Sequence, residues 1–431
     1  MLKIGLKISQ TLPLDSKLWL NYASGVLPLV EYNNNHMTSK SSRILFTSTY
    51  SQPYLSGITD YIATVSQFLA KKNSVTLASF QHDSNLATKE MVEGVNLIRI
   101  PVHFKISKGF INFNYPKIIW QLVKDHDQIF INSPQVEGIF VALAAKILHK
   151  RLIVIYHCEL FFESGFGLKL IEFFANFLTW ITVGLSDQII TYTLDYAQAS
   201  PILKFWLKKV KVLAPPIFLA KADFSFAKKL VDLKKNHAPI LGFSGRVSRE
   251  KGLDYLLESL EQLRLKYPNI CLWCAGTYGS DVAGEADYFQ TLQAQIQSKK
   301  LPVKFFGRLT KPQLAAFYKN ISVLVLPSVN KTEAFGMVQA EAMLSGTPVV
   351  TTDLPGVRAC VKLTGCGKVV PIKDSQALTL GINQVLNAKK SAENIAGIAQ
   401  KNFNTQQTLD WFQAFSTTDW HQFTKFFSPA K

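Results

Sequence analysis

The sequence predicts an α/β protein built from two doubly wound, Rossmann-like domains. Three observations lead to this prediction. The chain has 431 residues, more than one hydrophobic core of ordinary size holds. Short β-rich runs alternate with helical stretches through both halves, a pattern typical of βαβ crossovers in mostly parallel sheets. Around residues 214–238 an Ala-Pro-Pro segment and a charged stretch interrupt the alternation, which indicates a linker.

The first domain is predicted over residues 41–213. Its helical stretches begin with residues 58–70, and its strands are predicted at RILFTS, SVTLASF, QIFINS, LIVIYH and QIITYT. Residues 1–36 show no clear period, so we expect residues 1–40 to form an N-terminal extension without regular structure. Because a convincing strand follows Met37 closely, translation could begin there or at Met1.

The second domain is predicted over residues 214–415. Its strands are predicted at PILGFSG, ICLWCAG, VKFFG, VLVLPS, PVVTTD and GKVVP. Directly after the first of them, one helical face carries Leu253, Leu256, Leu257, Leu260 and Leu263. The tail, residues 416–431, is rich in aromatic residues and is expected to pack back on the first domain.

The net positive charge of the chain favours anionic binding partners. Lys and Arg number 47 against 30 Asp and Glu, a net charge of +17, which suits nucleotides or acidic membrane surfaces but also an ordinary solvated surface. No nucleic-acid-binding signature accompanies it. Five cysteines are sparse and odd in number, and the first twenty residues lack the apolar core of a secretory signal, so we expect a cytoplasmic protein.

One apolar stretch, residues 167–185, suggests membrane contact. Its charge-free part, Phe173 to Leu185, has 13 residues, against the ~20 that a spanning helix needs. A helix buried in the core or resting on the cytoplasmic face of a membrane is the expectation.

The first candidate site is the turn GFSGRVSREKG, residues 242–252. Arg246 and Lys251 lie between a predicted strand and the leucine-rich helix. Two cations beside a helix N-terminus can neutralise a diphosphate, although two isolated cations more often lie in solvent. The turn lacks the ending of a P-loop.

The second candidate site is EAFGMVQAEAMLSGTPVV, residues 333–350. Glu333 lies in a turn, and Glu341 lies on the helix that Gly336 opens. Eight helical residues span ~12 Å, so the two carboxylates suit the two ends of one extended ligand, such as the sugar and the ribose of a sugar nucleotide. Backbone N–H groups near Phe335 and Gly336 would face the phosphates. A solvated helix face is the alternative, but the apolar neighbours of Glu341 oppose it.

These two motifs resemble the donor domain of family-four retaining glycosyltransferases of the GT-B fold, the glycosyl transferases group 1. The fold implied is two facing Rossmann-like domains with a deep interdomain cleft. Weaker resemblance at PYLSGITDYIATVSQFLA, SDQIITYTLDYA and VKVLAPPI extends it over roughly residues 41–415.

The resemblance assigns roles to individual residues. Arg246 and Lys251 would bind the donor diphosphate, Glu333 the sugar hydroxyls and Glu341 the ribose. His157, at the end of a strand, would lie near the transferred sugar and join Arg246, Lys251 and Glu333 as a catalytic residue, unless it is an ordinary core histidine. The remaining donor-binding positions implied are Gly57, Gly245, Gly307, Ala334, Phe335, Gly336 and Met337.

One departure concerns the first-domain loop at Gly57. The family often shows two glycines there, whereas this chain has Ser56 in the first place.

The function implied is retaining transfer of a sugar from a UDP- or GDP-sugar to a carbohydrate, lipid-linked or small-molecule acceptor, in polysaccharide, glycolipid or glycoconjugate synthesis. No metal or other cofactor is expected. Asp125 and Asp127 form a DxD pattern, but they precede the strand QIFINS at its amino end, away from the expected cleft. The alternatives are a nonhydrolysing sugar-nucleotide epimerase of the same architecture and a noncatalytic sugar-binding protein. An oxidoreductase is disfavoured because no GxGxxG follows a predicted strand.

Overall fold

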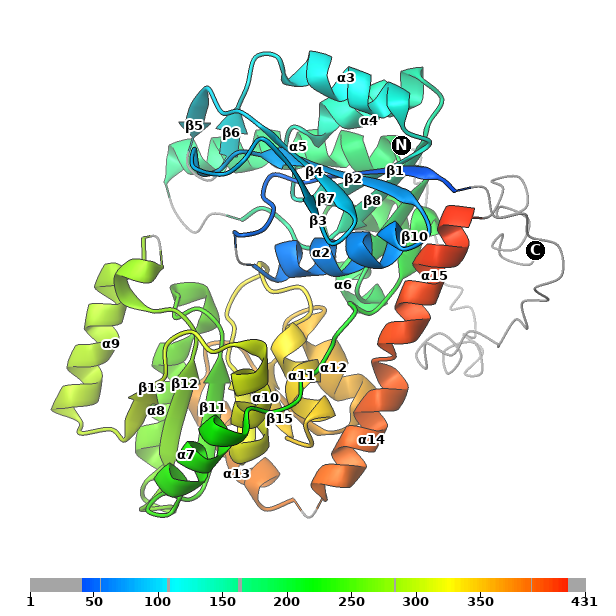
Figure 1. Ribbon diagram of the computed structural model, residues 1–431. Helices are drawn as coiled ribbons and strands as arrows, with labels where there is room; N and C mark the ends of the chain where they lie inside the picture. Colours follow the sequence, from blue (N-terminus) through cyan, green and yellow to red (C-terminus); the bar gives the residue numbers. More distant parts are fainter. Residues whose placement is uncertain are drawn as a thin grey trace, which may run out of the picture. The chain divides into compact units, whose positions relative to one another are not determined.

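A computed structural model describes residues 41–54, 56–106, 109–161, 165–282, 284–388 and 390–417. The extension predicted over residues 1–40 and most of the predicted tail lie outside the described residues. The described chain forms two large β-sheets, each flanked by helices (Figure 1).

The first sheet has eight strands in the order β10-β9-β8-β7-β1-β2-β4-β3. All neighbours are parallel except β3 and β4. Its strands are β1 (Arg43–Thr47), β2 (Ser74–Phe80), β3 (Lys89–Val92), β4 (Val95–Ile100), β7 (Gln128–Ser133), β8 (Arg151–Tyr156), β9 (Gln188–Thr191) and β10 (Val210–Val212). A separate hairpin pairs β5 (Phe104–Ile106) with β6 (Gly109–Ile111). The five predicted strands are confirmed, whereas β3, β4 and β10 were not predicted.

Helices cover both faces of this sheet. They are α2 (Gly57–Ala70), α3 (Tyr115–Asp125), α4 (Gly138–Ile147), α5 (Phe166–Leu185) and α6 (Leu194–Ala199). In Figure 1, α3, α4 and α5 lie together on one side and α2 on the other. Successive β1 side chains pack on opposite faces of the sheet. Ile44 and Phe46 share a core with α2, while Leu45 shares one with α3 and α4.

The second sheet has six parallel strands in the order β13-β12-β11-β14-β15-β16. They are β11 (Ile240–Ser244), β12 (Cys271–Ala275), β13 (Val303–Phe305), β14 (Val323–Leu326), β15 (Val349–Thr352) and β16 (Gly367–Val370), so all six predicted strands are confirmed. The helices of this half are α8 (Leu253–Leu263), α9 (Ala286–Ser298), α10 (Lys311–Asn320), α11 (Met337–Leu344), α12 (Val357–Thr364) and α13 (Ser375–Leu386). The leucine-rich helix is α8, and its five predicted core leucines are buried.

The segment predicted as a linker, residues 214–238, contains a helix, α7 (Phe224–Lys234). Asp223 caps it by accepting a hydrogen bond from the N–H of Phe226. Phe226 also packs edge-on against Phe306, and Leu230 is buried. The sequence did not predict this helix, because four of its eleven residues, Lys228, Lys229, Asp232 and Lys234, are charged and few apolar positions mark its buried face.

Strand order fixes where a ligand site can form. In both sheets the chain order reverses beside the first strand, between β1 and β7 and between β11 and β14. In open α/β sheets, ligands bind outside the carboxyl ends of the strands at such a switch point. The loops that follow β11 and β14 are the two candidate sites found in the sequence.

The last helices, α14 (Ala392–Asn402) and α15 (Thr405–Thr417), bring the chain back to the first sheet. Phe412 and Phe415 are fully buried, and both ring centroids lie 6.1 Å from that of Phe130 in β7. The carbonyl of Ser416 accepts hydrogen bonds from Ser42 Oγ (2.8 Å) and Gln128 Nε2 (2.9 Å). The described start of the predicted tail therefore lies against the first sheet.

Truncation of Phe412 to alanine should destabilise the fold strongly. The ring is fully buried between α15 and the first sheet, so its loss should lower the free energy of unfolding by about 3–5 kcal/mol. Phe224→Ala is the matched control, because that side chain is 84% exposed and should cost under about 0.5 kcal/mol. Urea unfolding followed by far-UV circular dichroism measures both; equal costs would contradict this packing.

Candidate active site

The first site loop is a tight turn after β11. A 3-10 turn, Arg249–Lys251, is followed by Gly252 with φ +63, and α8 starts directly after it. A Cβ on Gly252 would lie 2.3 Å from the carbonyl oxygen of Pro327. Glycine therefore lets this turn lie against the end of β14, which places Lys251 beside the second loop.

The two predicted loops meet in an ion pair. Lys251 Nζ bonds one carboxylate oxygen of Glu333, and the other oxygen accepts a hydrogen bond of 3.0 Å from the N–H of Gly336. Both charged side chains are mostly buried. The predicted convergence of Lys251 and Glu333 is thus present in the structure.

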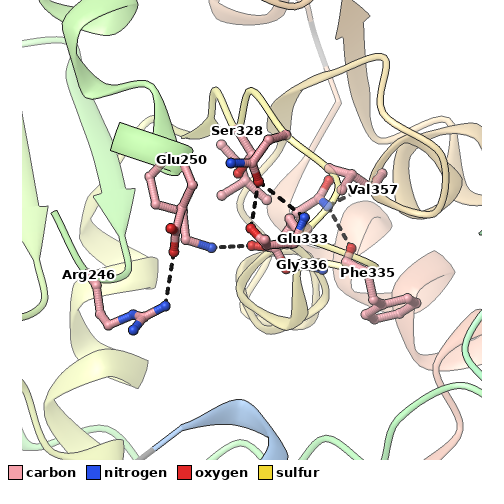
Figure 2. A network of polar contacts seen from close by, with 12 residues as sticks. Arg246, Glu250, Ser328, Glu333, Phe335, Gly336 and Val357 are labelled. Atoms are coloured by element: carbon pink, nitrogen blue, oxygen red, sulfur yellow. Dashed lines mark hydrogen bonds and ion pairs between the residues drawn. The ribbon is translucent and has the colours of Figure 1, made fainter. Parts of the chain in front are cut away.

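Arg246 points to a different carboxylate. Its Nη2 lies 2.9 Å from Glu250 Oε1, beside the Lys251–Glu333 pair (Figure 2). Glu250 was not predicted as a site residue. Its position between two predicted phosphate ligands, within one short turn, is the signal that could have revealed it.

Gly336 opens α11 in a conformation that needs glycine. Its φ is +74, and a Cβ would lie 2.6 Å from both Leu326 Cδ2 and Gln339 Nε2. The Gly336 N–H was predicted to face a phosphate, whereas here it binds the carboxylate of Glu333.

Ala334 and Phe335 are buried beside it. The Phe335 ring centroid lies 5.7 Å from that of Tyr192, which directly follows β9, and the Phe335 carbonyl accepts a hydrogen bond from Gln339 Nε2 (2.9 Å). These contacts fix the backbone of the loop, so Phe335 acts here as a core residue.

Glu341 has surroundings of its own. The hydroxyl of Tyr318 donates to its Oε2 at 2.7 Å, and Ser244 Oγ lies 3.1 Å from that hydroxyl. Burial raises the pKa of the Glu341 carboxyl above its usual value, against the hydrogen bond from Tyr318. The separate partners of Glu333 and Glu341 fit the expectation that they do not grip the same atom.

Glu341 also lines a cavity between the two halves. The lining comes from α2, residues 216–220, α10 and α11, and includes Asp60, Lys311 and Met337. Lys311 Nζ lies 3.7 Å from Asp60. Arg246, Lys251 and Glu333 are not among the residues that line this cavity. Of the four predicted donor ligands, only Glu341 therefore faces the cavity, and the other three lie at the ion pairs outside it.

Gly57 brings the first half to α11. A Cβ on Gly57 would lie 2.5 Å from Met337 Cε. Ser56 caps α2, because its Oγ accepts from the N–H of Thr59 (3.1 Å) while Thr59 Oγ1 accepts from the N–H of Ser56 (3.0 Å). This capping box explains the serine at the position where the family often has glycine.

His157 is a buried, neutral residue. It is 2% exposed, its Nδ1 bonds the hydroxyl of Tyr192, and its Nε2 lies 3.0 Å from Asn132 Oδ1. Burial lowers its pKa to about 3. Both ring nitrogens are engaged, so this geometry favours the core-histidine alternative over proton transfer by this residue.

The next residue, Cys158, lies near the ion pairs and was missed in the sequence. Burial, then the charges of Glu333 and Glu159, raise the pKa of its thiol to about 12. Cys158 is therefore a neutral thiol at neutral pH.

Three glycines line up at the carboxyl ends of neighbouring strands. A Cβ on Gly276 would lie 1.9 Å from the carbonyl oxygen of Gly245, and the N–H of Gly276 donates to the carbonyl of Gly307 at 2.8 Å. Nothing lies within 4 Å of a Cβ on Gly307. Gly276 was missed, although three successive predicted strands each end in glycine.

The DxD pattern has a structural use. Asp127 binds Arg43 Nη2 at 2.7 Å, and Asp125 accepts from Gln121 Nε2 at 2.9 Å. Across the described ranges, no three His, Cys, Asp or Glu side chains cluster as metal ligands could.

Acid should weaken the fold through His157. Its folded pKa of about 3 lies below the ordinary 6.5, so the unfolded chain takes up the proton first and stability falls as pH drops from about 6.5 toward 3. Between about pH 7.5 and 5.0, this one group should cost roughly 2 kcal/mol. Urea unfolding at both pH values should show that His157→Gln loses less stability than the unsubstituted protein; identical losses would contradict the assignment.

The second half of the chain is similar to known glycosyltransferases. Residues 226–402 match the family model of glycosyl transferases group 1. A D-inositol 3-phosphate glycosyltransferase of Corynebacterium urealyticum is 32% identical over 153 residues, which cover 35% of this chain and 35% of that relative. A lipopolysaccharide core mannosyltransferase of Rhizobium leguminosarum bv. viciae is 32% identical over 146 residues, covering 33% and 39%. The aligned parts thus span little more than a third of these relatives.

Solved structures show the same architecture over most of the chain. Sucrose-phosphate synthase from Thermosynechococcus elongatus has a TM-score of 0.70 at 19% identity, covering 89% of this chain and 99% of that one. Anabaena HepE in complex with UDP and glucose has a TM-score of 0.68 at 21% identity, covering 87% and 99%. The chain has the GT-B fold, and residues 226–402 are similar to the glycosyl transferases group 1.

Proposed function

We propose that this protein is a retaining glycosyltransferase that moves a sugar from a UDP-sugar to an acceptor hydroxyl, in polysaccharide, glycolipid or glycoconjugate synthesis. The observation that carries the proposal is the contact between Lys251 and Glu333. It joins the turn of residues 242–252, proposed to bind the diphosphate, to the loop at Glu333, proposed to bind the sugar. UDP is chosen over GDP because HepE structures contain UDP, UDP with glucose, and UDP-glucose.

Stabilisation of the leaving diphosphate is the main catalytic task in this proposal. As the bond to the sugar breaks, negative charge grows on the diphosphate, and fixed cations stabilise it more than they stabilise the bound substrate. Lys251 and Arg246 supply two such charges. Both are paired with carboxylates here, so the diphosphate would take the place of Glu250 or Glu333 beside them.

Exchange of partners gives Glu333 its second role. Once Lys251 turns to the diphosphate, the Glu333 carboxylate can accept hydrogen bonds from sugar hydroxyls. Glu341, buried beside Tyr318 and facing the cavity next to α2, is assigned to the ribose.

Retention follows from front-face attack in this scheme. The acceptor would approach on the side from which the diphosphate leaves, and its hydroxyl proton would pass to an oxygen of the departing diphosphate as the new glycosidic bond forms, without a covalent sugar–enzyme intermediate. Because two side-chain cations and helix N-termini neutralise the diphosphate, the scheme requires no metal ion.

Incubation with UDP-glucose alone tests the function. Water takes the place of the acceptor. Proton NMR then shows whether the glucose is released as the α or the β anomer, provided that the spectra are recorded before the two anomers equilibrate. A retaining transferase releases α-glucose and UDP, with the same rate in EDTA. GDP-glucose should react more slowly.

The two rivals give other products in this experiment. An epimerase would convert the sugar within the nucleotide without releasing glucose, and a noncatalytic binder would leave UDP-glucose intact. Release of β-glucose would overturn retention while preserving glycosyl transfer.

Arg246→Ala should slow turnover ~100-fold, because one preorganised charge beside the leaving group is lost. Arg249→Ala is the matched control: this neighbouring cation lies over the Tyr288 ring and 3.9 Å from Glu285, away from the Lys251–Glu333 pair. The control should change turnover less than about threefold. UDP release at saturating donor measures both variants, and equal rates would remove Arg246 from the mechanism.

A further inference from the structure

Helix α5 has its large apolar side chains on the outside. Its protein-facing positions are small or hydroxylated: Ala175, Thr179, Thr182 and Val183 are buried. Its solvent-facing positions are large and apolar: Leu170, Phe173, Phe174, Phe177 and Trp180 are exposed. An ordinary surface helix shows the opposite arrangement, so this face is suited to a partner that the described chain does not supply.

The apolar face continues beyond α5. Helix α4 contacts α5 and exposes Phe140, Leu143 and Ile147, which recur at helical spacing. At the other end of α5, Trp180 packs near Trp206, with ring centroids 5.7 Å apart, and the adjacent Phe205 is exposed. We call these α4, α5 and residue 205 side chains the apolar face.

Positive charge borders the apolar face. Residues 201–210, around Phe205, have three lysines, Lys204, Lys208 and Lys209, and no Asp or Glu. Lys209 Nζ caps α5 by donating to the carbonyls of Gly184 (2.6 Å) and Ser186 (2.9 Å). Lys204 and Lys208 are exposed, and Lys204 lies 5.1 Å from the centroid of the Phe205 ring.

We infer that the apolar face and these lysines dock the protein on the surface of an anionic lipid bilayer. Aromatic side chains beside lysines suit the boundary between acyl chains and acidic headgroups. A second copy of the chain fits less well, because each copy carries a net charge of +17 and supplies no excess of negative charge for the lysines.

Helix α5 lies on the bilayer and does not cross it. Residues Gly167–Leu185 are long and apolar enough to span a membrane, with mean hydropathy 1.4. However, α5 packs on α4 and β8, Asn176 Nδ2 donates to the carbonyl of Leu160 at 3.3 Å, and Val183 is fully buried. Spanning would remove α5 from the first sheet and leave its threonines in lipid.

Vesicle co-sedimentation of the full chain tests the docking surface independently of sugar transfer. The protein should sediment with phosphatidylcholine vesicles containing half phosphatidylglycerol, and much less with pure phosphatidylcholine. Phe173→Ser/Phe177→Ser should weaken binding more than about tenfold. Lys204→Gln/Lys208→Gln should weaken it about fivefold per lysine removed, and only on the anionic vesicles.

Phe224→Ser/Leu265→Ser is the matched control, because both side chains are more than four-fifths exposed in the second half of the chain. It should bind like the unsubstituted protein, and unchanged melting temperatures should show that all variants are folded. Failure to sediment with anionic vesicles, or unchanged binding of both α5 and lysine variants, overturns the proposal. The proposal is also overturned if light scattering shows that the protein is a dimer and that the Phe173→Ser/Phe177→Ser variant is a monomer.

Discussion

The ion pair between Lys251 and Glu333 is the contact on which the candidate site depends. These residues lie 82 positions apart, in the loops after β11 and β14. The same carboxylate also accepts the N–H of Gly336, at the start of α11. One carboxylate thus holds a cation and a helix N-terminus together, two groups that both attract anions. A diphosphate has the same charge sign and more oxygens, so it is suited to replace this internal anion.

The strand order explains why these loops meet. Both loops lie where the chain order of the strands reverses in the second sheet, and the strands that precede them, β11 and β14, are adjacent. Gly252 allows the close approach, since any larger residue would meet the carbonyl of Pro327. Topology therefore brings the loops to one edge, and Gly252 lets the turn that carries Lys251 lie against the end of β14.

Patterns in the sequence predicted the sheets well and the site in part. Eleven strands could be located because parallel buried strands form short apolar runs that glycine and proline interrupt. The edge strands β3 and β10 are only partly buried and lack such runs. Within the site, residue types could predict that Lys251 and Glu333 converge. They could not predict that Glu250 pairs with Arg246, or that Tyr192 and Asn132 engage both nitrogens of His157, because those contacts depend on side-chain directions across separate loops.

Contacts between the two halves of the chain also hold the loop that carries Glu333. Asp195, on α6, binds Arg358 through both carboxylate oxygens and accepts the N–H of Gly356 at 2.8 Å. Burial opposes ionisation of Asp195, but the Arg358 guanidinium and this N–H lower its pKa below the usual range. A Cβ on Gly356 would lie 2.1 Å from the carbonyl oxygen of Ala334, the residue after Glu333. Asp195 therefore holds, from the first half, the backbone on which the Glu333 loop rests. Any shift of α6 against α12 must strain this bidentate bond or move that loop, so the orientation of the two halves and the position of the Glu333 carboxylate are mechanically linked.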